Sequence, residues 1–282
     1  MGLSSVMQTA LSGLSASGTL LEFAAHNLAN SQTPGFKASH VNLATQSYQT
    51  RLGGANPMQV GRGVRVSGTT IDFSQGSIEP DDQPALLALE GEGLFILEGP
   101  GDERLYTRDG SFALGAAGEL LARGGYRVLG YAMGEGSELD TSQLVPLHIA
   151  LGSQVADAQG QATTLTTFSV EPDGTILGHT SDGGQQLLGQ LQLTRFANPG
   201  GLVQRAGNAF RASPASGLPI ESAPGEQGAA EVVAGATELS NVDIGRELID
   251  LTLAENQFRA NLAVWHTADS LLDELFFPWR AW

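Results

Sequence analysis

The chain has 282 residues, enough to bury a sizeable core in one large or two modest domains. Its 30 acidic residues outnumber its 14 basic residues, and the formal net charge of −16 argues against nucleic-acid binding through phosphate groups. Because there is no cysteine, disulfides, thiolate nucleophiles and cysteine-ligated metal sites are excluded. The sequence also lacks a run of about 18 apolar residues, so we expect no insertion into a membrane.

The first 37 residues predict a long helix that ends in a turn. Apolar or small residues alternate at steps of four and three, which keeps them on one face of a helix that has a partner. Pro34 and Gly35 end the helix, because proline cannot continue it and glycine relaxes the turn. Many glycines and serines weaken the helix, so we expect it to form mainly by packing on a partner. The residues of this face are Leu3, Met7, Ala10, Leu14, Ser17, Leu21, Ala24 and Leu28.

The middle of the chain predicts β structure. Residues 38–60 are polar and are interpreted as an irregular connector. From Gly61 onward the hydrophobic period falls to two, and strong turn signals separate short segments. Residues 172–174 (Pro-Asp-Gly) predict a hairpin turn, residues 134–142 a loose interval, and residues 198–237 a mostly extended return. Strands are expected at 64–66, 71–73, 94–97, 104–107, 111–114, 126–131, 167–170, 175–177 and 187–194.

The end of the chain predicts a second long helix with the same alternation. The face is interrupted by two acids, and an ordinary amphipathic helix on a globular core remains an alternative. The resulting fold class is mixed, with a β-rich central domain flanked by N- and C-terminal helices that pair with each other. The positions of this face are Ile244, Leu248, Leu251, Glu255, Phe258, Leu262, Trp265, Asp269, Leu272 and Phe276.

Nothing in the sequence indicates an active site. The five histidines show no metal-ligand spacing, and there is neither a Gly-x-Ser-x-Gly elbow nor a phosphate-binding loop. Gly91-Glu92-Gly93 precedes a predicted strand instead of opening a helix, so it is not a dinucleotide loop. Asp109-Gly110 is interpreted as the tip of a hairpin. The sequence therefore predicts no catalytic residue, no cofactor, no metal and no enzyme activity.

Several short runs, in order along the chain, resemble bacterial flagellar rod and hook proteins, the axial family of the flagellum. The first run contains Asn27, Leu28, Ala29, Asn30, Thr33, Pro34, Gly35, Phe36 and Lys37. The middle runs are 91–95, 106–112 and 118–120. The last runs are 216–219, 224–226 and 238–243, which include Ser240, Asn241 and Val242. The tail 276–282 departs from the family pattern.

This resemblance implies a structural axial subunit that polymerises into the distal rod of the basal body. A hook or proximal-rod paralogue is the alternative. It further implies export by the flagellar type III apparatus without a cleaved signal peptide, and a final place outside the inner membrane. No basic residue occurs before Lys37, which agrees with the absence of a conventional leader. The implied partners are further copies in a helical homopolymer, other rod and hook subunits, the export apparatus and outer-ring bushing proteins.

In this family the terminal helices pair as a coiled coil that lines a tube, with the β domain outside. The expected divisions are 1–36 with 240–282 as the helical domain, 37–75 as the connector, and 76–239 as the β-rich outer domain. Both ends are expected to order only on assembly. A secreted cell-wall-acting β-domain enzyme and a binding module of a secretion system are the competing hypotheses. The predicted assembly interface is Leu3, Met7, Leu14, Leu21, Leu28, Ile244, Leu248, Leu251, Phe258, Leu262, Trp265 and Leu272.

Overall fold

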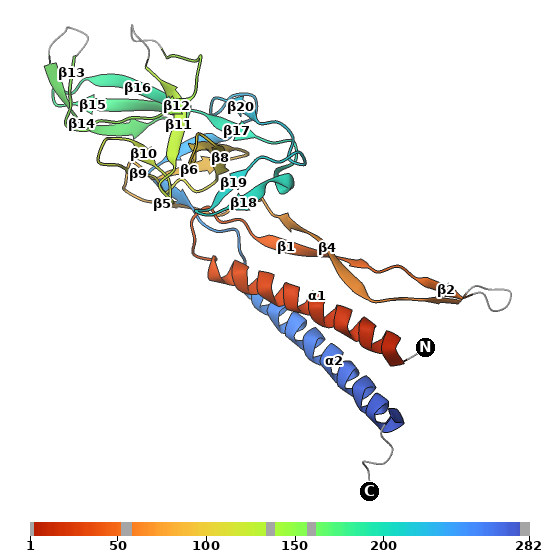
Figure 1. The fold of residues 1–282 in the computed structure, drawn as a ribbon. Helices are drawn as coiled ribbons and strands as arrows, with labels where there is room; N and C mark the ends of the chain where they lie inside the picture. Colours follow the sequence, from red (N-terminus) through yellow and green to blue (C-terminus); the bar gives the residue numbers. More distant parts are fainter. Residues whose placement is uncertain (1–2, 52–57, 134–138, 157–161, 277–282) are drawn as a thin grey trace. The chain divides into compact units, whose positions relative to one another are not determined.

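The computed structural model describes residues 3–51, 58–133, 139–156 and 162–276, and the chain divides into two compact units (Figure 1). The first, here called the helical unit, comprises Met1–Ser31, Ala38–Asp72 and Val242–Trp282. The second, here called the β unit, comprises Gln32–Lys37 and Phe73–Asn241. Part of the predicted 134–142 interval and residues 277–282 of the tail lie outside the described residues.

Two helices that lie side by side form the main part of the helical unit (Figure 1). Helix α1 spans Leu3–Ala29 and helix α2 spans Ile244–Phe276, which confirms the predicted helices at both ends. Asp243 caps α2, since its Oδ1 accepts hydrogen bonds from the N–H groups of Gly245 and Arg246 at 2.8 and 3.2 Å. Neither of these helices is apolar enough over its length to cross a membrane.

A β-hairpin lies beside α1, where the sequence predicted an irregular connector. Strand β1 (Ser39–Thr45) pairs antiparallel with β4 (Val64–Ile71), and β2 (Gln49–Arg51) pairs with β3 (Met58–Val60). The prediction of irregular structure over 38–60 was therefore wrong for these strands. Most β1 side chains are exposed or half-buried, so the alternation of polar and apolar residues that reveals a half-buried strand is absent there. Strand β4 contains the strand expected at 64–66.

The β unit is built around one large antiparallel sheet. The predicted β-rich middle is confirmed, because nearly every predicted segment from 94 onward contributes a strand. The main order of strands is β13-β14-β15-β16-β11-β7-β8-β19-β18. Its bounds are β7 Leu94–Glu98, β8 Arg104–Thr107, β11 Arg127–Ala132, β13 Gln154–Ala156, β14 Ala162–Val170, β15 Thr175–Thr180, β16 Gln185–Leu191, β18 Val203–Arg205 and β19 Ala209–Arg211.

Shorter strands complete the β unit at its edges. Strands β6 and β21 pair with each other, as do β5 and β22, and these two pairs bring the end of the unit back to its beginning. The remaining bounds are β5 Ile78–Pro80, β6 Leu87–Glu90, β9 Ala113–Leu114, β10 Leu120–Leu121, β12 Val145–Pro146, β17 Leu193–Arg195, the 3-10 turn Pro199–Gly201, β20 Ile220–Ser222, β21 Glu231–Ala234 and β22 Ala236–Glu238.

The hydrophobic core of the β unit lies under the central strands. Phe95 on β7 is fully buried and meets Phe112 edge to face, with ring centroids 4.9 Å apart. Leucines, isoleucines and valines from β6, β8, β11, β15 and β16 surround this pair. The apolar positions of the predicted strands therefore recur because they face this core.

Candidate assembly site and the motif cluster

Small residues form the line along which α1 and α2 meet. On α1, Ala10, Ser17 and Ala24 recur every seven residues and are all buried. On α2, Ala254 and Ala268 are each 3% exposed. Side chains of this size let two helix backbones approach closely, so the contact between the helices requires small side chains at these positions. At Gly13, an added Cβ would lie 2.6 Å from Oδ1 of Asn261 on the opposite helix.

The bulky residues of the predicted interface flank this line. Most are half-buried, but Ile244 and Leu248 at the start of α2 are each 48% exposed. These two side chains are therefore not buried within the described chain, and a role in contact between copies stays a prediction. The half-buried members are Leu3, Met7, Leu14, Leu21 and Leu28 on α1, and Leu251, Phe258, Leu262, Trp265 and Leu272 on α2.

Asn27, from the first motif, joins three elements of the helical unit. Its Oδ1 accepts a hydrogen bond from the Ser39 N–H at 3.0 Å, and its Nδ2 donates to the Ser39 carbonyl at 2.9 Å. The amide therefore pairs with β1 as a neighbouring strand would. The same Nδ2 donates to Oε1 of Glu247 on α2 at 2.9 Å. Since Asn27 is 1% exposed, its amide fixes α1, β1 and α2 together.

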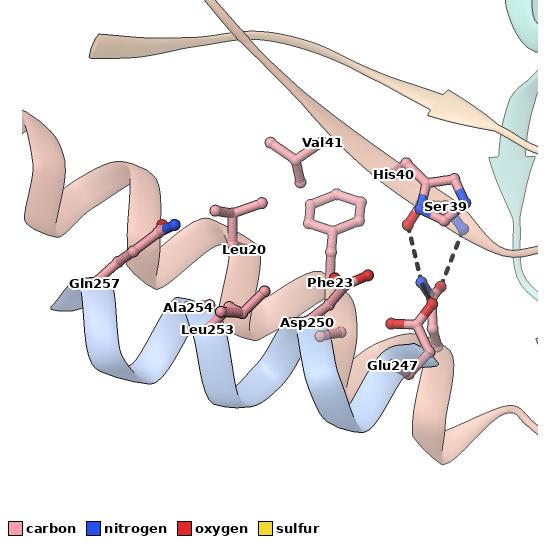
Figure 2. Close-up of a pocket in the computed structure, with 12 residues that line it drawn as sticks. Leu20, Phe23, Ser39, His40, Val41, Glu247, Asp250, Leu253, Ala254 and Gln257 are labelled. Carbon is pink, nitrogen blue, oxygen red and sulfur yellow. Dashed lines mark hydrogen bonds between the residues drawn. The ribbon is translucent and has the colours of Figure 1, made fainter. Parts of the chain in front are cut away.

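A groove of about 260 Å³ opens beside this junction (Figure 2). Leu20 and Phe23 of α1 and Val41 of β1 supply an apolar wall. Glu247 and Asp250 of α2 bring two carboxyl groups to the same groove. The groove therefore combines apolar surface with negative charge, all within the helical unit. Its other lining residues are Ala24, Asn27, Ser39, His40, Leu253, Ala254 and Gln257.

In the β unit, a fully buried ion pair joins the first and last motifs. Nζ of Lys37 lies 2.7 Å from Oε1 of Glu238, and both side chains are 0% exposed. The lysine also donates to the Ser74 carbonyl at 2.6 Å, and the Gly76 N–H donates to Oε1 of Glu238 at 2.9 Å. A buried charge persists only when paired and hydrogen-bonded, and here both conditions are met.

Arg108, from the middle motif, completes the cluster on the other side of Glu238. Its Nε donates to Oε2 of the same carboxylate, so the single negative charge of Glu238 pairs with two cations. The guanidinium also donates to three carbonyl oxygens, those of Leu89, Gly91 and Gly93, at 2.6–2.9 Å. We call Lys37, Arg108 and Glu238 the motif cluster, because they come from three runs that are far apart in sequence. The 91–93 run takes part through its carbonyls.

The rest of the first motif fits around this cluster. Gly35 has a φ of +64°, and its N–H donates to the Glu238 carbonyl at 2.7 Å. Phe36 is buried and its carbonyl accepts from the Asn241 N–H, while the Pro34 carbonyl accepts from the side chain of Asn208 at 2.9 Å. Of the other motif residues, Leu28, Asn30, Thr33, Ser240 and Val242 are half-buried and Ala29 is exposed.

Asp109 is buried, which contradicts its interpretation as a hairpin tip. Strand β8 ends at Thr107 and does not pair with β9, and the Asp109 side chain is 3% exposed. Its Oδ1 accepts the Ser111 N–H at 2.9 Å, while Oδ2 lies 3.1 Å from Nε of Arg123 without hydrogen-bond geometry. Burial raises the pKa of the Asp109 carboxyl, and the Ser111 bonds and the Arg123 charge oppose that rise only in part.

Asp109→Asn should leave the stability at neutral pH unchanged within about 1 kcal/mol, or raise it. A carboxyl with a raised folded-state pKa binds its proton more tightly in the folded chain. Its contribution to stability is therefore full in acid and is lost as pH rises from the unfolded value, near 3.8, through the folded value. We expect urea unfolding at several pH values to show that the free energy of unfolding falls less with rising pH in the variant than in the unchanged chain over this window. A steeper fall in the free energy of unfolding of the variant than in that of the unchanged chain would contradict this account.

Sequence reasoning missed the motif cluster, although it singled out the runs that contain it. Lys37 and Glu238 are 201 residues apart, and Arg108 and Glu238 are 130 apart, so no local pattern connects them. One signal was available. Lys37 is the only lysine in the chain, and the other 13 basic residues are arginines.

Among the residues that the structure describes, no group of three or more His, Asp or Glu side chains could hold a metal ion. His40 lines the groove, and His179 bonds through Nε2 to the Ser169 hydroxyl at 2.9 Å. The polar arrangements found are instead structural. Both the Asn27 junction and the motif cluster hold chain segments in place.

Comparison with known proteins finds two family models that match parts of this chain. Residues 88–178 match the family model described as flagellar hook protein FlgE/F/G D1 domain, and residues 233–276 match the C-terminal domain of flagellar basal body rod FlgEFG proteins. Both matches include residues of the motif cluster or of helix α2.

Similar full-length proteins point to one branch of this family. The flagellar basal-body rod protein FlgG of Bacillus subtilis is 31% identical over 281 residues, covering 95% of this chain and 97% of that protein. FlgG of Borreliella burgdorferi is 29% identical, with 94% of each chain covered. The flagellar hook protein FlgE of Helicobacter mustelae is 39% identical, but over 43% of this chain and 29% of its own length. The chain thus belongs to the flagellar rod and hook protein family and is most like its FlgG members.

Proposed function

We propose that this chain is a structural subunit of the flagellar rod, in its distal part. The observation that supports this most is the match to rod proteins named FlgG, which runs through 97% of the Bacillus subtilis relative. The similarity to the hook protein covers only 29% of that protein, which makes the hook alternative weaker. The proposal includes no enzyme activity, and the families matched are named for rod and hook proteins.

The proposed partners are further copies of the chain and neighbouring rod and hook subunits. Export through the flagellar type III apparatus, without cleavage, and contact with outer-ring bushing proteins belong to the same proposal. Basal-body location outside the inner membrane follows from it. These points rest on family membership.

We also propose that α1 and α2 act as a coiled coil in the assembled rod. The seven-residue recurrence of Ala10, Ser17 and Ala24 supports this, because a strict heptad keeps one line of a helix on its partner. The exposed Ile244 and Leu248 would then be covered by neighbouring copies. In this proposal, the helices gain much of their stability from assembly, since α1 is rich in glycine and serine.

The decisive experiment locates the chain in purified basal bodies. An epitope inserted at Gly101 suits this purpose, because its Cβ direction is open and the turn is exposed. Labelling should mark the distal rod in cells that lack their own copy of the gene. Labelling of the hook instead would favour the hook paralogue, and absence from basal bodies would refute both.

Hydrogen exchange on secreted monomer and on basal bodies tests the helix proposal. Amides of residues 3–28 and 244–272 should exchange fast in the monomer and slowly in the assembly. The core strands β7 and β8 provide the internal control, since they should be protected in both states. Equal protection of both helices in a verified monomer would contradict ordering on assembly.

A further inference from the structure

Charge is segregated within the helical unit. Residues 38–71, which include the hairpin, contain three arginines and no acidic residue, in a chain with a net charge of −16. Helix α2 has six acidic and two basic residues. The helical unit therefore contains a positively charged hairpin and a negatively charged helix α2.

The arginines and the groove lie toward opposite ends of α1. The part of the hairpin that bears Arg62 and Arg65 contacts the N-terminal half of α1, where the Val64 N–H donates to Ser12 Oγ at 3.2 Å. The start of β1, at Ser39, His40 and Val41, lines the groove. The groove adjoins the C-terminal half, at Leu20, Phe23 and Ala24. Twelve residues of helix separate Ser12 from Ala24, a rise of about 18 Å. Arg62 and Arg65 are exposed and form no ion pair with any residue in the described part of the chain.

The groove has matching features. Asp250 is exposed and likewise has no ion-pair partner among the described residues. Leu253, at the edge of the groove, is 53% exposed, and Phe23 is half-buried. The hairpin also presents apolar surface, since Val66 on β4 and its cross-strand partner Leu43 are 36% and 43% exposed. Each surface offers apolar area together with charge, of opposite sign.

We propose that the groove binds the arginine-bearing part of the hairpin of a second copy of this chain, with Arg65 placed against Asp250. Because the two surfaces lie at different ends of one unit, the contact is head-to-tail and leaves one free surface at each end. Such a contact repeats without closing unless its rotation closes a ring, which suits a filament. Complementary charge sets the register and raises the rate of correct encounter, while the apolar surface stabilises the contact. This inference rests on the proposed function and specifies which surfaces meet.

Charge reversal tests the contact in cells that lack their own copy of the gene. Asp250→Lys and Arg65→Glu should each lower the amount of chain in purified basal bodies about ten-fold or more, because like charges then face each other. Asp273→Lys and Arg246→Glu are the matched controls. They make the same charge changes at exposed positions of α2 outside the groove, and they should incorporate within about two-fold of the unchanged chain.

Combining the two charge reversals distinguishes loss of this contact from a general effect of changed charge on incorporation. The double variant Asp250→Lys/Arg65→Glu should restore incorporation. Co-expression of the two single variants should also restore it, because alternating copies then pair unlike charges at every contact. A single variant that incorporates normally, or a double variant and a mixture that both fail, would overturn the proposal. If Asp250→Lys fails while Arg65→Glu incorporates normally, another basic partner occupies the groove and the proposal is likewise wrong.

The unchanged chain distinguishes the two levels of inference. If it is absent from basal bodies, the proposed function fails and the contact fails with it. If it is present and the charge reversals have no effect, only the proposed contact fails. The amount of each variant secreted into the medium shows whether export is intact, and urea unfolding of the secreted chain shows whether its β unit is folded.

Discussion

Replacing Glu238 with Gln should lower the free energy of unfolding of the β unit by about 3–5 kcal/mol, the usual cost of breaking a buried ion pair from one side. The change preserves the size of the side chain but removes the negative charge between Lys37 and Arg108. The side chains of these two cations are 0% and 5% exposed, so water cannot replace the lost carboxylate. Urea unfolding followed by circular dichroism measures the loss.

Glu221→Gln is the matched control for this substitution. Glu221 pairs with Arg104 at 2.6 Å, but the side chains of both residues are partly exposed, at 30% and 50%. Solvent screens such a pair, and its loss should cost at most about 1 kcal/mol. Equal effects of the two substitutions would show that burial of the motif cluster contributes nothing beyond an ordinary surface ion pair.

The single lysine provides a second measurement. In the folded chain an amine-reactive ester should spare Lys37, whose side chain is 0% exposed, and modify the α-amino group alone. In Glu238→Gln, modification of Lys37 should become fast, and mass spectrometry can locate it. Adding Lys37→Met to Glu238→Gln should recover part of the lost stability, since it removes one of the two unpaired cations. No recovery would indicate that Arg108 alone accounts for the loss.

Gly35→Ala should destabilise the β unit by roughly 3 kcal/mol or more, as the sum of backbone strain and forced displacement. Gly35 has a φ of +64°, which an L-residue adopts only with strain. An added Cβ would also lie 2.5 Å from both the Cα and the N of Asp109. These are backbone atoms next to Arg108, so relief of the clash would shift the motif cluster.

Gly101→Ala separates the two causes. Gly101 has a similar φ of +73°, but no atom lies within 4 Å of where its Cβ would be. This variant should show only the conformational cost, about 1 kcal/mol. The difference between the two variants in urea unfolding gives the cost of the close approach at Gly35. If the two values agree, the contact with Asp109 is not tight in solution.

Local chemistry made much of the fold predictable. Pro34 cannot continue a helix, and α1 ends before it, at Ala29. The 3.5-residue alternation of Leu14, Ser17 and Leu21 indicates a helix with a partner. Alternating segments and turns such as 172–174 likewise predicted strands that the structure contains, including β14 and β15. Strand β4 was expected in part, at 64–66 and 71–73, whereas β1 was missed, because its largely exposed side chains carry no such alternation.

The sequence by itself therefore determined two terminal helices, a β-rich middle and membership of an axial flagellar family, since each depends on local periodicity or on runs of adjacent residues. Only the tertiary structure decided which side chains meet. It buried Asp109, brought Lys37, Arg108 and Glu238 together, and placed small residues rather than leucines at the centre of the helix contact. Such contacts depend on the path of the backbone between residues that are far apart in sequence, and no local pattern predicts which distant residues will meet. Lys37 illustrates this, because its partner Glu238 lies 201 residues away.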